Sequence, residues 1–215
     1  DLRNPLTSLL ASSENLSRDT GRLKPEQIKM FADIINRTSK KILDQLNELV
    51  EWAKTQREKT SFKPEKLHLW HFINESLDLL RENSAQKEIK LENNVAEHFY
   101  INADSLMLRS ILQNVVTNAI KFTPHGGGTV QVTATAAANM VEICIKDDGV
   151  GMAQETKDML FRDASSASLL GTSMEKGTGL GLLLVKDFVA THGGAIKVES
   201  ELNNGTCFMF TMPGV

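Results

Sequence analysis

One carboxylate in this sequence is predicted to lie inside a hydrophobic layer. In the run Val141–Asp147, positions 141, 143 and 145 are apolar, and the twofold alternation of a β-strand puts Asp147 on the same face. A buried carboxylate is costly unless a donor pairs with it. Gly149 and Gly151 follow directly, and glycines allow a tight turn and the close approach of a flat ligand to the backbone. These residues favour a carboxylate that accepts a hydrogen bond from a ligand such as the amino group of a purine. Taken singly, each of them is also explained by a capped turn.

A second strand-like run, Thr206–Met212, repeats this pattern. Thr206 shares a face with the phenylalanines at 208 and 210, so its hydroxyl is predicted to enter the same core layer. Taken alone, Thr206 is better explained as a core hydroxyl satisfied within the protein. Beside Asp147, it adds a second polar group to that layer.

An amide-bearing helix is the third feature that could do chemistry. Residues 110–120 contain no charge, which predicts a largely buried helix, yet Asn114, Asn118 and Lys121 form a narrow stripe along it. Amide oxygens ligate hard cations such as Mg²⁺, and a lysine neutralises phosphate. The alternative is an internal hydrogen-bonded network with a lysine that reaches the solvent. The helix by itself supports both interpretations equally.

A glycine-rich run opens a later helix, and its residues are Lys176, Gly177, Thr178, Gly179, Leu180 and Gly181. Alternating glycines at a helix N-terminus expose main-chain N–H groups to an anion. The run is not a Walker motif, and it does not follow a strand as a dinucleotide-binding fingerprint must. The preceding stretch 163–173 is rich in Ser, Ala and Gly and lacks apolar periodicity, which predicts a loop that can close over phosphates.

The elements that must position these groups fall into two unlike halves. From 1 to 60, heptad-like spacing predicts two helices joined by a turn near 19–22, with Pro25 in the first turn of the second helix. The long seam of the second helix comprises Ile28, Phe31, Ile35, Thr38, Ile42, Gln45, Leu49 and Trp52. Such a wide apolar stripe favours dimerisation into a four-helix bundle. The alternative is a single hairpin that leans on the second half of the chain.

The second half, 61–215, alternates helical and strand-like patterns. Helices are predicted near 70–83, 103–122 and 181–191, and strands at 90–92, 100–102, 129–135, 141–147, 195–200 and 206–212. The fold class is therefore predicted to be α+β, a two-layer sandwich with one mixed sheet and helices on a single face.

Composition excludes several classes of protein. The 215 residues carry a net charge of −3, which gives no footprint for nucleic acid, and no run of apolar residues is long enough to cross a bilayer. Cys144 and Cys207, far apart in sequence, are expected to be reduced packing residues in a cytoplasmic protein. The sequence opens at Asp1 within an amphipathic pattern, which indicates a piece of a longer protein whose membrane tether would lie upstream.

Taken together, the motifs resemble the sensor histidine kinase core over nearly the whole chain. Residues 114–124 resemble the asparagine box of that family, 147–151 and 177–182 its two glycine boxes, 161–162 its phenylalanine box, and 205–208 its closing strand. The resemblance implies the ATP-binding fold shared with gyrase, Hsp90 and MutL (GHKL, or Bergerat). It also implies that Asn118 ligates Mg²⁺ and that Asn114 and Lys121 hold phosphates. Asp147 would bind the adenine amino group, and Thr206 would support the adenine. Residues 163–176 would form an ATP lid.

The opening residues Asp1–Leu6 are similar to the stretch that directly follows the phosphoacceptor histidine in this family. By resemblance, Asp1 matches an acidic residue that assists phosphotransfer, and Asn4 matches an amide that orients water for phosphatase activity. No histidine precedes Asp1 in this sequence. The five histidines present, at 68, 71, 98, 125 and 192, have no spacing that replaces it. We therefore expect this stretch to bind ATP without phosphorylating itself.

The expected function is phosphoryl transfer from Mg·ATP to a histidine and on to an aspartate of a response-regulator receiver domain. The expected domains are a dimerising helical hairpin (1–60), through which the chain would form a homodimer, and a catalytic ATP-binding domain (61–215), with no contact to nucleic acid or membrane. An alternative is an ATP-binding interaction module without phosphotransfer. Steady ATP hydrolysis of the Hsp90 or MutL kind is not expected, because position 114 carries Asn, which cannot accept a proton.

Overall fold

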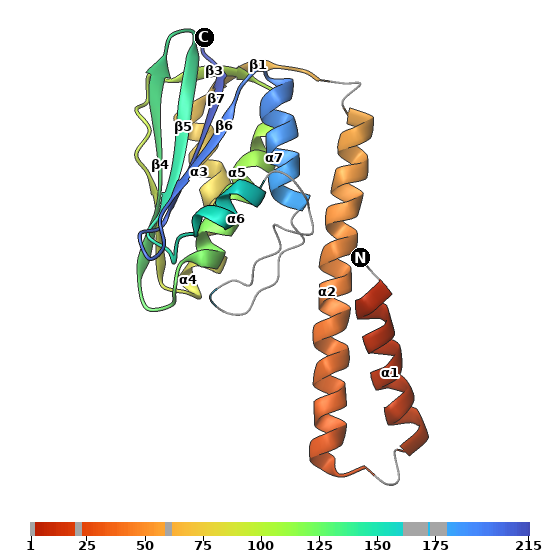
Figure 1. Ribbon diagram of the computed structural model, residues 1–215. Coiled ribbons are helices and arrows are strands. Elements are labelled where there is room, and N and C mark those ends of the chain that lie inside the picture. The colour runs from red at the N-terminus through yellow and green to blue at the C-terminus, as the bar shows by residue number, and fades with distance from the viewer. Residues whose placement is uncertain (1–2, 20–22, 59–61, 161–171, 173–179) are drawn as a thin grey trace. The chain divides into compact units, whose positions relative to one another are not determined.

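The computed structural model describes residues 3–19, 23–58, 62–160, 172 and 180–215. These residues form two compact units, Asp1–Thr60 and Ser61–Val215, which are described separately below (Figure 1).

The first unit is a helical hairpin of α1 (Arg3–Asp19) and α2 (Pro25–Glu58), which lie side by side (Figure 1). Pro25 occupies the first position of α2, where its missing N–H costs no helical hydrogen bond. Several apolar side chains remain uncovered by the hairpin: Leu6 (49% exposed), Leu10 (58%), Leu43 (58%) and Leu46 (43%). The predicted pair of helices is confirmed, and the second of them continues to Glu58.

The second unit is built on a five-stranded sheet of order β2-β4-β5-β7-β6. Its strands are β2 (Ile89–Asn93), β4 (Gly128–Ala137), β5 (Met140–Asp147), β6 (Ile196–Ser200) and β7 (Thr206–Pro213). β2 runs parallel to β4 and the other neighbours are antiparallel, so the sheet is mixed as predicted. A separate two-stranded sheet pairs β1 (Glu65–His68) with β3 (Tyr100–Ala103).

Helices cover one face of this sheet (Figure 1). They are α3 (Leu69–Asp78), α4 (Arg81–Ala85), α5 (Ser105–Phe122), α6 (Gln154–Met159) and α7 (Leu180–Thr191). The core lies between the two layers and contains Ile73, Leu108, Ile111, Val115, Ile143, Ile145, Val185 and Phe210, all at most 1% exposed. The α+β sandwich is confirmed. The helix predicted over 70–83 is interrupted at Leu79–Leu80, and the short elements β1 and α6 were not predicted.

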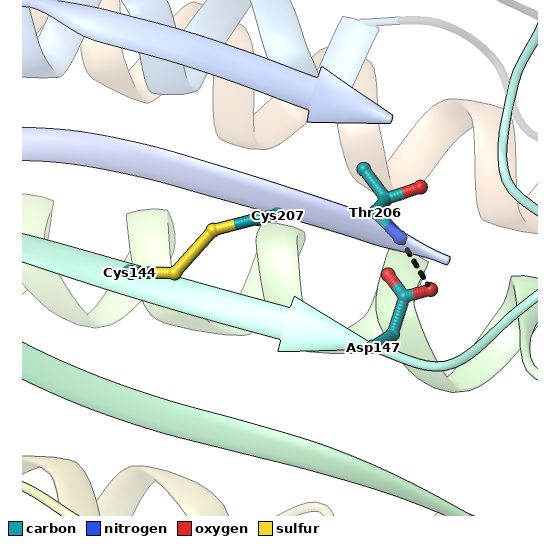
Figure 2. Close-up of a disulfide and its surroundings, with 4 residues drawn as sticks. All are labelled: Cys144, Asp147, Thr206 and Cys207. Atoms are coloured by element: carbon teal, nitrogen blue, oxygen red, sulfur yellow. Dashed lines mark hydrogen bonds between the residues drawn. A yellow bond between two sulfur atoms is a disulfide. The ribbon is translucent and has the colours of Figure 1, made fainter. Parts of the chain in front are cut away.

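The expectation that both cysteines are reduced is wrong in this structure, where Cys144 and Cys207 form a disulfide (Figure 2). In the β5–β7 ladder Cys144 lies opposite Met209 and Cys207 opposite Lys146. The two cysteines are therefore diagonal neighbours on one face of the sheet, with Cα atoms 6.3 Å apart. Their separation of 63 residues conceals this proximity, which only strand pairing reveals.

Within the described ranges, no helix combines the length and the apolar content that crossing a bilayer requires.

Candidate functional site

The site is centred on Asp147, the last residue of β5, which is 2% exposed. Its Oδ1 accepts hydrogen bonds from the main-chain N–H groups of Gly149 (2.9 Å) and Thr206 (3.2 Å; Figure 2). Among the residues that the structure describes, none donates a hydrogen bond to Oδ2. The inward-facing carboxylate predicted from the sequence is thus present, and both of these hydrogen bonds go to the same one of its oxygens.

Burial is the main reason why the pKa of Asp147 is raised, from 3.8 to about 6. The hydrogen bonds from Gly149 and Thr206 favour the ionised form and partly offset this, whereas the neighbouring charge of Asp148 adds to it. The carboxylate is therefore ionised at neutral pH, but at a cost that a hydrogen-bond donor from a ligand would reduce. Perturbed carboxylates of this kind mark functional sites.

Thr206 lies opposite Asp147 in the ladder and is also buried. The hydroxyl of Ser200 donates to the main-chain oxygen of Gly205 (2.8 Å), so the Thr206 hydroxyl is the donor in its 3.0 Å contact with Ser200 Oγ. Its side chain is thus satisfied internally. The main-chain N–H of Thr206 orients Asp147. The alternation of side chains along a strand could not predict this role, because it says nothing about main-chain hydrogen bonds.

The two glycines after Asp147 permit close contacts between main-chain segments. A Cβ on Gly149 would lie 2.5 Å from the Phe122 oxygen, at the end of α5, and the N–H of Val150 donates to that same oxygen at 3.1 Å. Gly151 has a φ of +64°, and a Cβ there would lie 1.8 Å from the Glu201 oxygen. Glycine at both positions therefore holds the turn beside Asp147 against α5 and the β6–β7 connection.

Helix α5 carries the predicted amide stripe. Its N-terminus is capped by Asp104, whose Oδ1 accepts from the N–H groups of Leu106 and Met107, both at 3.1 Å. Its core face, which contains Leu108, Ile111, Leu112, Val115, Val116 and Ala119, is buried against the sheet. Asn114, Asn118 and Lys121 lie beside that face and are only half-buried, so they remain accessible.

Asn114 connects α5 to the start of α7. Its Nδ2 donates to the Ser110 oxygen at 2.8 Å, and a Cβ on Gly181 would lie 2.3 Å from its Oδ1. The first turn of α7 therefore contacts the amide stripe directly. The Lys121 Nζ lies 4.8 Å from the centroid of the Phe122 ring.

Several predicted residues cannot be placed. Asp1 and the glycine-run residues Lys176–Gly179 lie outside the described residues, as does the predicted lid apart from Thr172. Leu180 begins α7 with its side chain not described, and Asn4 lies in the first turn of α1, in the other unit. The structure thus brings Gly149 and Thr206 to Asp147, Gly149 to the C-terminal end of α5, and Gly181 to Asn114.

The donor set fits a magnesium nucleotide. No group of three His, Cys, Asp or Glu side chains suited to a metal occurs among the residues with a described position. A buried acceptor oxygen suits the base of a nucleotide. Half-buried amides beside a helix N-terminus suit its phosphate chain.

Comparison with known proteins agrees with this geometry. Residues 103–215 match the family described as histidine kinase-, DNA gyrase B- and HSP90-like ATPase, and residues 1–58 match the His Kinase A (phospho-acceptor) domain. The chain therefore belongs to the histidine kinase-, DNA gyrase B- and HSP90-like ATPase family, with the domain order of a sensor histidine kinase core.

Individual relatives support the same assignment. Histidine protein kinase DivJ of Caulobacter vibrioides is 31% identical over an alignment of 216 residues, which covers 99% of this chain and 36% of DivJ. The structure of ShkA in complex with AMPPNP is 25% identical, with a TM-score of 0.69, and covers 98% of this chain and 46% of ShkA. That of histidine kinase ThkA in complex with response regulator protein TrrA shares the fold, with 22% identity and a TM-score of 0.74 over all of this chain and 59% of ThkA. The chain spans 26–41% of the length of the first three curated relatives it matches.

Proposed function

We propose that this protein is the cytoplasmic core of a two-component sensor histidine kinase. Residues 61–215 would bind Mg·ATP, and the γ-phosphate would pass to a histidine and then to an aspartate of a response-regulator receiver domain. The observation that carries the proposal is the buried Asp147 carboxylate, whose Oδ2 has no donor among the described residues, beside the accessible amide stripe of α5.

The base would bind at the end of β5. The adenine amino group is a donor of the kind that Asp147 Oδ2 lacks, and pairing it with a buried carboxylate gives a strong, charge-assisted hydrogen bond. The Thr206 N–H keeps the carboxylate oriented through Oδ1. The Thr206 hydroxyl, whose hydrogen is donated to Ser200, would support the adenine as an acceptor. Gly149 and Gly151 hold the adjoining turn in place.

The phosphates would lie between α5 and the start of α7. Asn114 and Lys121 would contact phosphate oxygens and Asn118 would ligate Mg²⁺, because amide oxygens suit this hard cation. Main-chain N–H groups of Lys176–Gly181 would bind phosphate at the N-terminus of α7. When bound, Mg²⁺ would neutralise charge on the phosphates, so the protein's own task is chiefly positioning.

The helical unit would supply dimerisation and the acceptor. Leu6, Leu10, Leu43 and Leu46 are exposed on the hairpin, and burying them against a second copy would complete a four-helix bundle. Asp1 would assist phosphotransfer, and Asn4 would orient water for dephosphorylation of the response regulator. ThkA, which has a similar fold, forms a complex with a response regulator, and a receiver domain is the partner that we propose here.

The decisive experiment uses a longer form of the protein that includes the residues before Asp1. Incubation with γ-labelled ATP and Mg²⁺ should give acid-labile, base-stable phosphate on the protein, and a receiver domain added afterwards should remove the label. ATP binding without any label would instead indicate a nucleotide-binding module. Lack of ATP binding would contradict the kinase proposal altogether.

A further inference from the structure

A buried lysine outside the predicted site holds the C-terminal end of α5. Lys87 lies between α4 and β2 and is 6% exposed. Its Nζ donates to the main-chain oxygens of Ile120 (3.1 Å) and Lys121 (2.9 Å) and lies 3.4 Å from that of Thr123. The last carbonyl groups of a helix have no partner within the helix, and a cation there also complements the helix dipole.

Thr172 completes this cluster. Lys87 Nζ donates to the Thr172 hydroxyl at 2.9 Å, and that hydroxyl lies 3.0 Å from each of the Lys121 and Thr123 oxygens. The N–H of Thr172 also donates to the Lys121 oxygen at 3.2 Å. Among the described residues, four oxygen atoms therefore surround the ammonium group, and three of them come from the segment that ends α5.

The same segment supports the turn beside Asp147. Phe122 lies between Lys121 and Thr123, whose main-chain oxygens both contact Lys87 and Thr172. The main-chain oxygen of Phe122 itself accepts a hydrogen bond from the Val150 N–H at 3.1 Å. Gly149 is packed closely against that oxygen. Any shift of the last turn of α5 would therefore move the turn whose Gly149 N–H donates to Asp147.

We propose that Lys87 is a positioning residue of the nucleotide site. Its ammonium fixes the last turn of α5, the Phe122 oxygen then fixes the Gly149–Val150 turn, and that turn orients the Asp147 carboxylate. This inference rests on the nucleotide-binding function proposed above. An apolar side chain in place of Lys87 would remove the ammonium donor from the Ile120 oxygen and from the Lys121 and Thr123 oxygens that it shares with Thr172, and it would let the turn fray.

The test compares two variants that each remove a cap of α5. Lys87→Met acts at the C-terminal end, and Asp104→Ala removes the N-terminal cap far from the site along the same helix. Titration calorimetry with Mg·ATP on residues 1–215 should show about a tenfold weaker affinity for Lys87→Met and a change below about threefold for Asp104→Ala, at comparable loss of stability in urea. Equal losses of affinity in both variants, or none in Lys87→Met, would overturn the role of Lys87.

Amide hydrogen exchange without nucleotide gives a second, independent readout. In Lys87→Met the Val150 N–H should exchange about tenfold faster relative to the Thr211 N–H, which bonds the Ala195 oxygen in the sheet. A merely structural role would accelerate both amides equally, and that result would reject the proposal.

A milder variant covers the case in which Lys87→Met does not fold. Thr172→Val alters an exposed side chain, keeps the ammonium group and should weaken Mg·ATP binding about threefold, since one of the surrounding oxygens is lost. Unchanged affinity there would contradict the cluster's role. Lack of binding by the unaltered protein would instead overturn the proposed function, so the two failures are distinguishable.

Discussion

Asp147 and Thr206 lie directly opposite each other in the β5–β7 ladder, and the Thr206 main-chain N–H donates to Asp147 Oδ1 at 3.2 Å. With the N–H of Gly149, this bond fixes one oxygen of a buried carboxylate, and no described residue donates a hydrogen bond to the other. Such a one-sided arrangement makes the carboxylate a selective acceptor.

Replacing the carboxylate separates its binding role from its structural role. Asp147→Asn retains Oδ1 as an acceptor for both N–H groups but turns an amide donor towards the proposed adenine amino group. We expect ATP affinity to fall about 10- to 100-fold, since a hydrogen bond to a charged group contributes about 1.5–3 kcal/mol. Calorimetry measures this loss. Asp148→Asn, at an exposed neighbour, is the matched control, and ATP affinity unchanged by Asp147→Asn would contradict the adenine assignment.

The same substitution should stabilise the protein without nucleotide. Because burial raises the pKa of Asp147 from 3.8 to about 6, ionising it in the fold is unfavourable at neutral pH. Asp147→Asn should therefore raise the free energy of unfolding at pH 7 by up to about 3 kcal/mol, at about 1.4 kcal/mol per pK unit. Urea unfolding tests this, and a marked destabilisation would indicate that the charge supports the fold.

The raised pKa also predicts two opposite pH dependences. Between pH 4 and 6 the folded protein binds more protons at Asp147 than the unfolded chain does, so this residue's contribution to stability falls as the pH rises through that range. ATP affinity should change the other way, dropping about tenfold per unit below pH 6, because the acceptor becomes protonated. Neither dependence should persist in Asp147→Asn. Identical pH profiles for both proteins would rule Asp147 out as the titrating group.

Gly181 offers a test of the α5–α7 contact. A Cβ in Gly181→Ala would lie 2.3 Å from Asn114 Oδ1 and must displace that amide. We expect Mg·ATP affinity to fall about tenfold while stability is kept, because alanine favours a helix by about 1 kcal/mol over glycine. Gly214→Ala, whose Cβ would lie 3.3 Å from the nearest atom, should bind normally. A Gly181→Ala variant with full affinity would remove Asn114 from the phosphate site.

The disulfide should contribute measurably to stability. It closes a loop between residues 63 apart, so replacing both cysteines by serine, or adding a reductant, should lower the free energy of unfolding by about 2–4 kcal/mol. Cys144→Ser alone and Cys207→Ser alone should each cost as much as the double change, because either breaks the link. Insensitivity of the unaltered protein to reductant would show that the bond is absent in solution.

Dimerisation can be tested on the long helix. Ile42 is half-buried on the hairpin and belongs to the predicted seam, so Ile42→Lys should dissociate the dimer by placing a charge there. Ser39→Lys, on the exposed side of the same helix, is the control. Light scattering gives the mass directly, and a monomeric unaltered protein would contradict the four-helix bundle.

Local periodicity explains what the sequence could predict. The alternation in 141–147 placed Asp147 in the core, and heptad spacing located both helices of the hairpin, because each pattern records which side of an element is buried. β1 and α6 escaped this reasoning for the same reason. β1 is the polar run Glu65–His68, and α6 buries none of its residues, so neither shows an apolar pattern.

Relationships between distant segments could not be predicted. The Cys144–Cys207 bond depends on β5 pairing with β7, and the role of Lys87 depends on a turn of chain 33 residues further on. One helix was predicted over 70–83, but α3 ends at Asp78 and α4 begins at Arg81. Leu80, in the interruption between them, is buried, so the apolar pattern gives no sign that the helix is interrupted there. In each case tertiary packing determines the structure, and the spacing of residues along the chain does not indicate that packing.

The position of the two sulfur atoms has a practical consequence. Cys144 precedes Asp147 by three residues and Cys207 directly follows Thr206, yet alternation turns the thiols towards the helix-free side of the sheet. After reduction, a fluorophore attached to either thiol would lie on the opposite face of the strands that we propose bind the base. It could report ligand occupancy in real time without obstructing entry to the site.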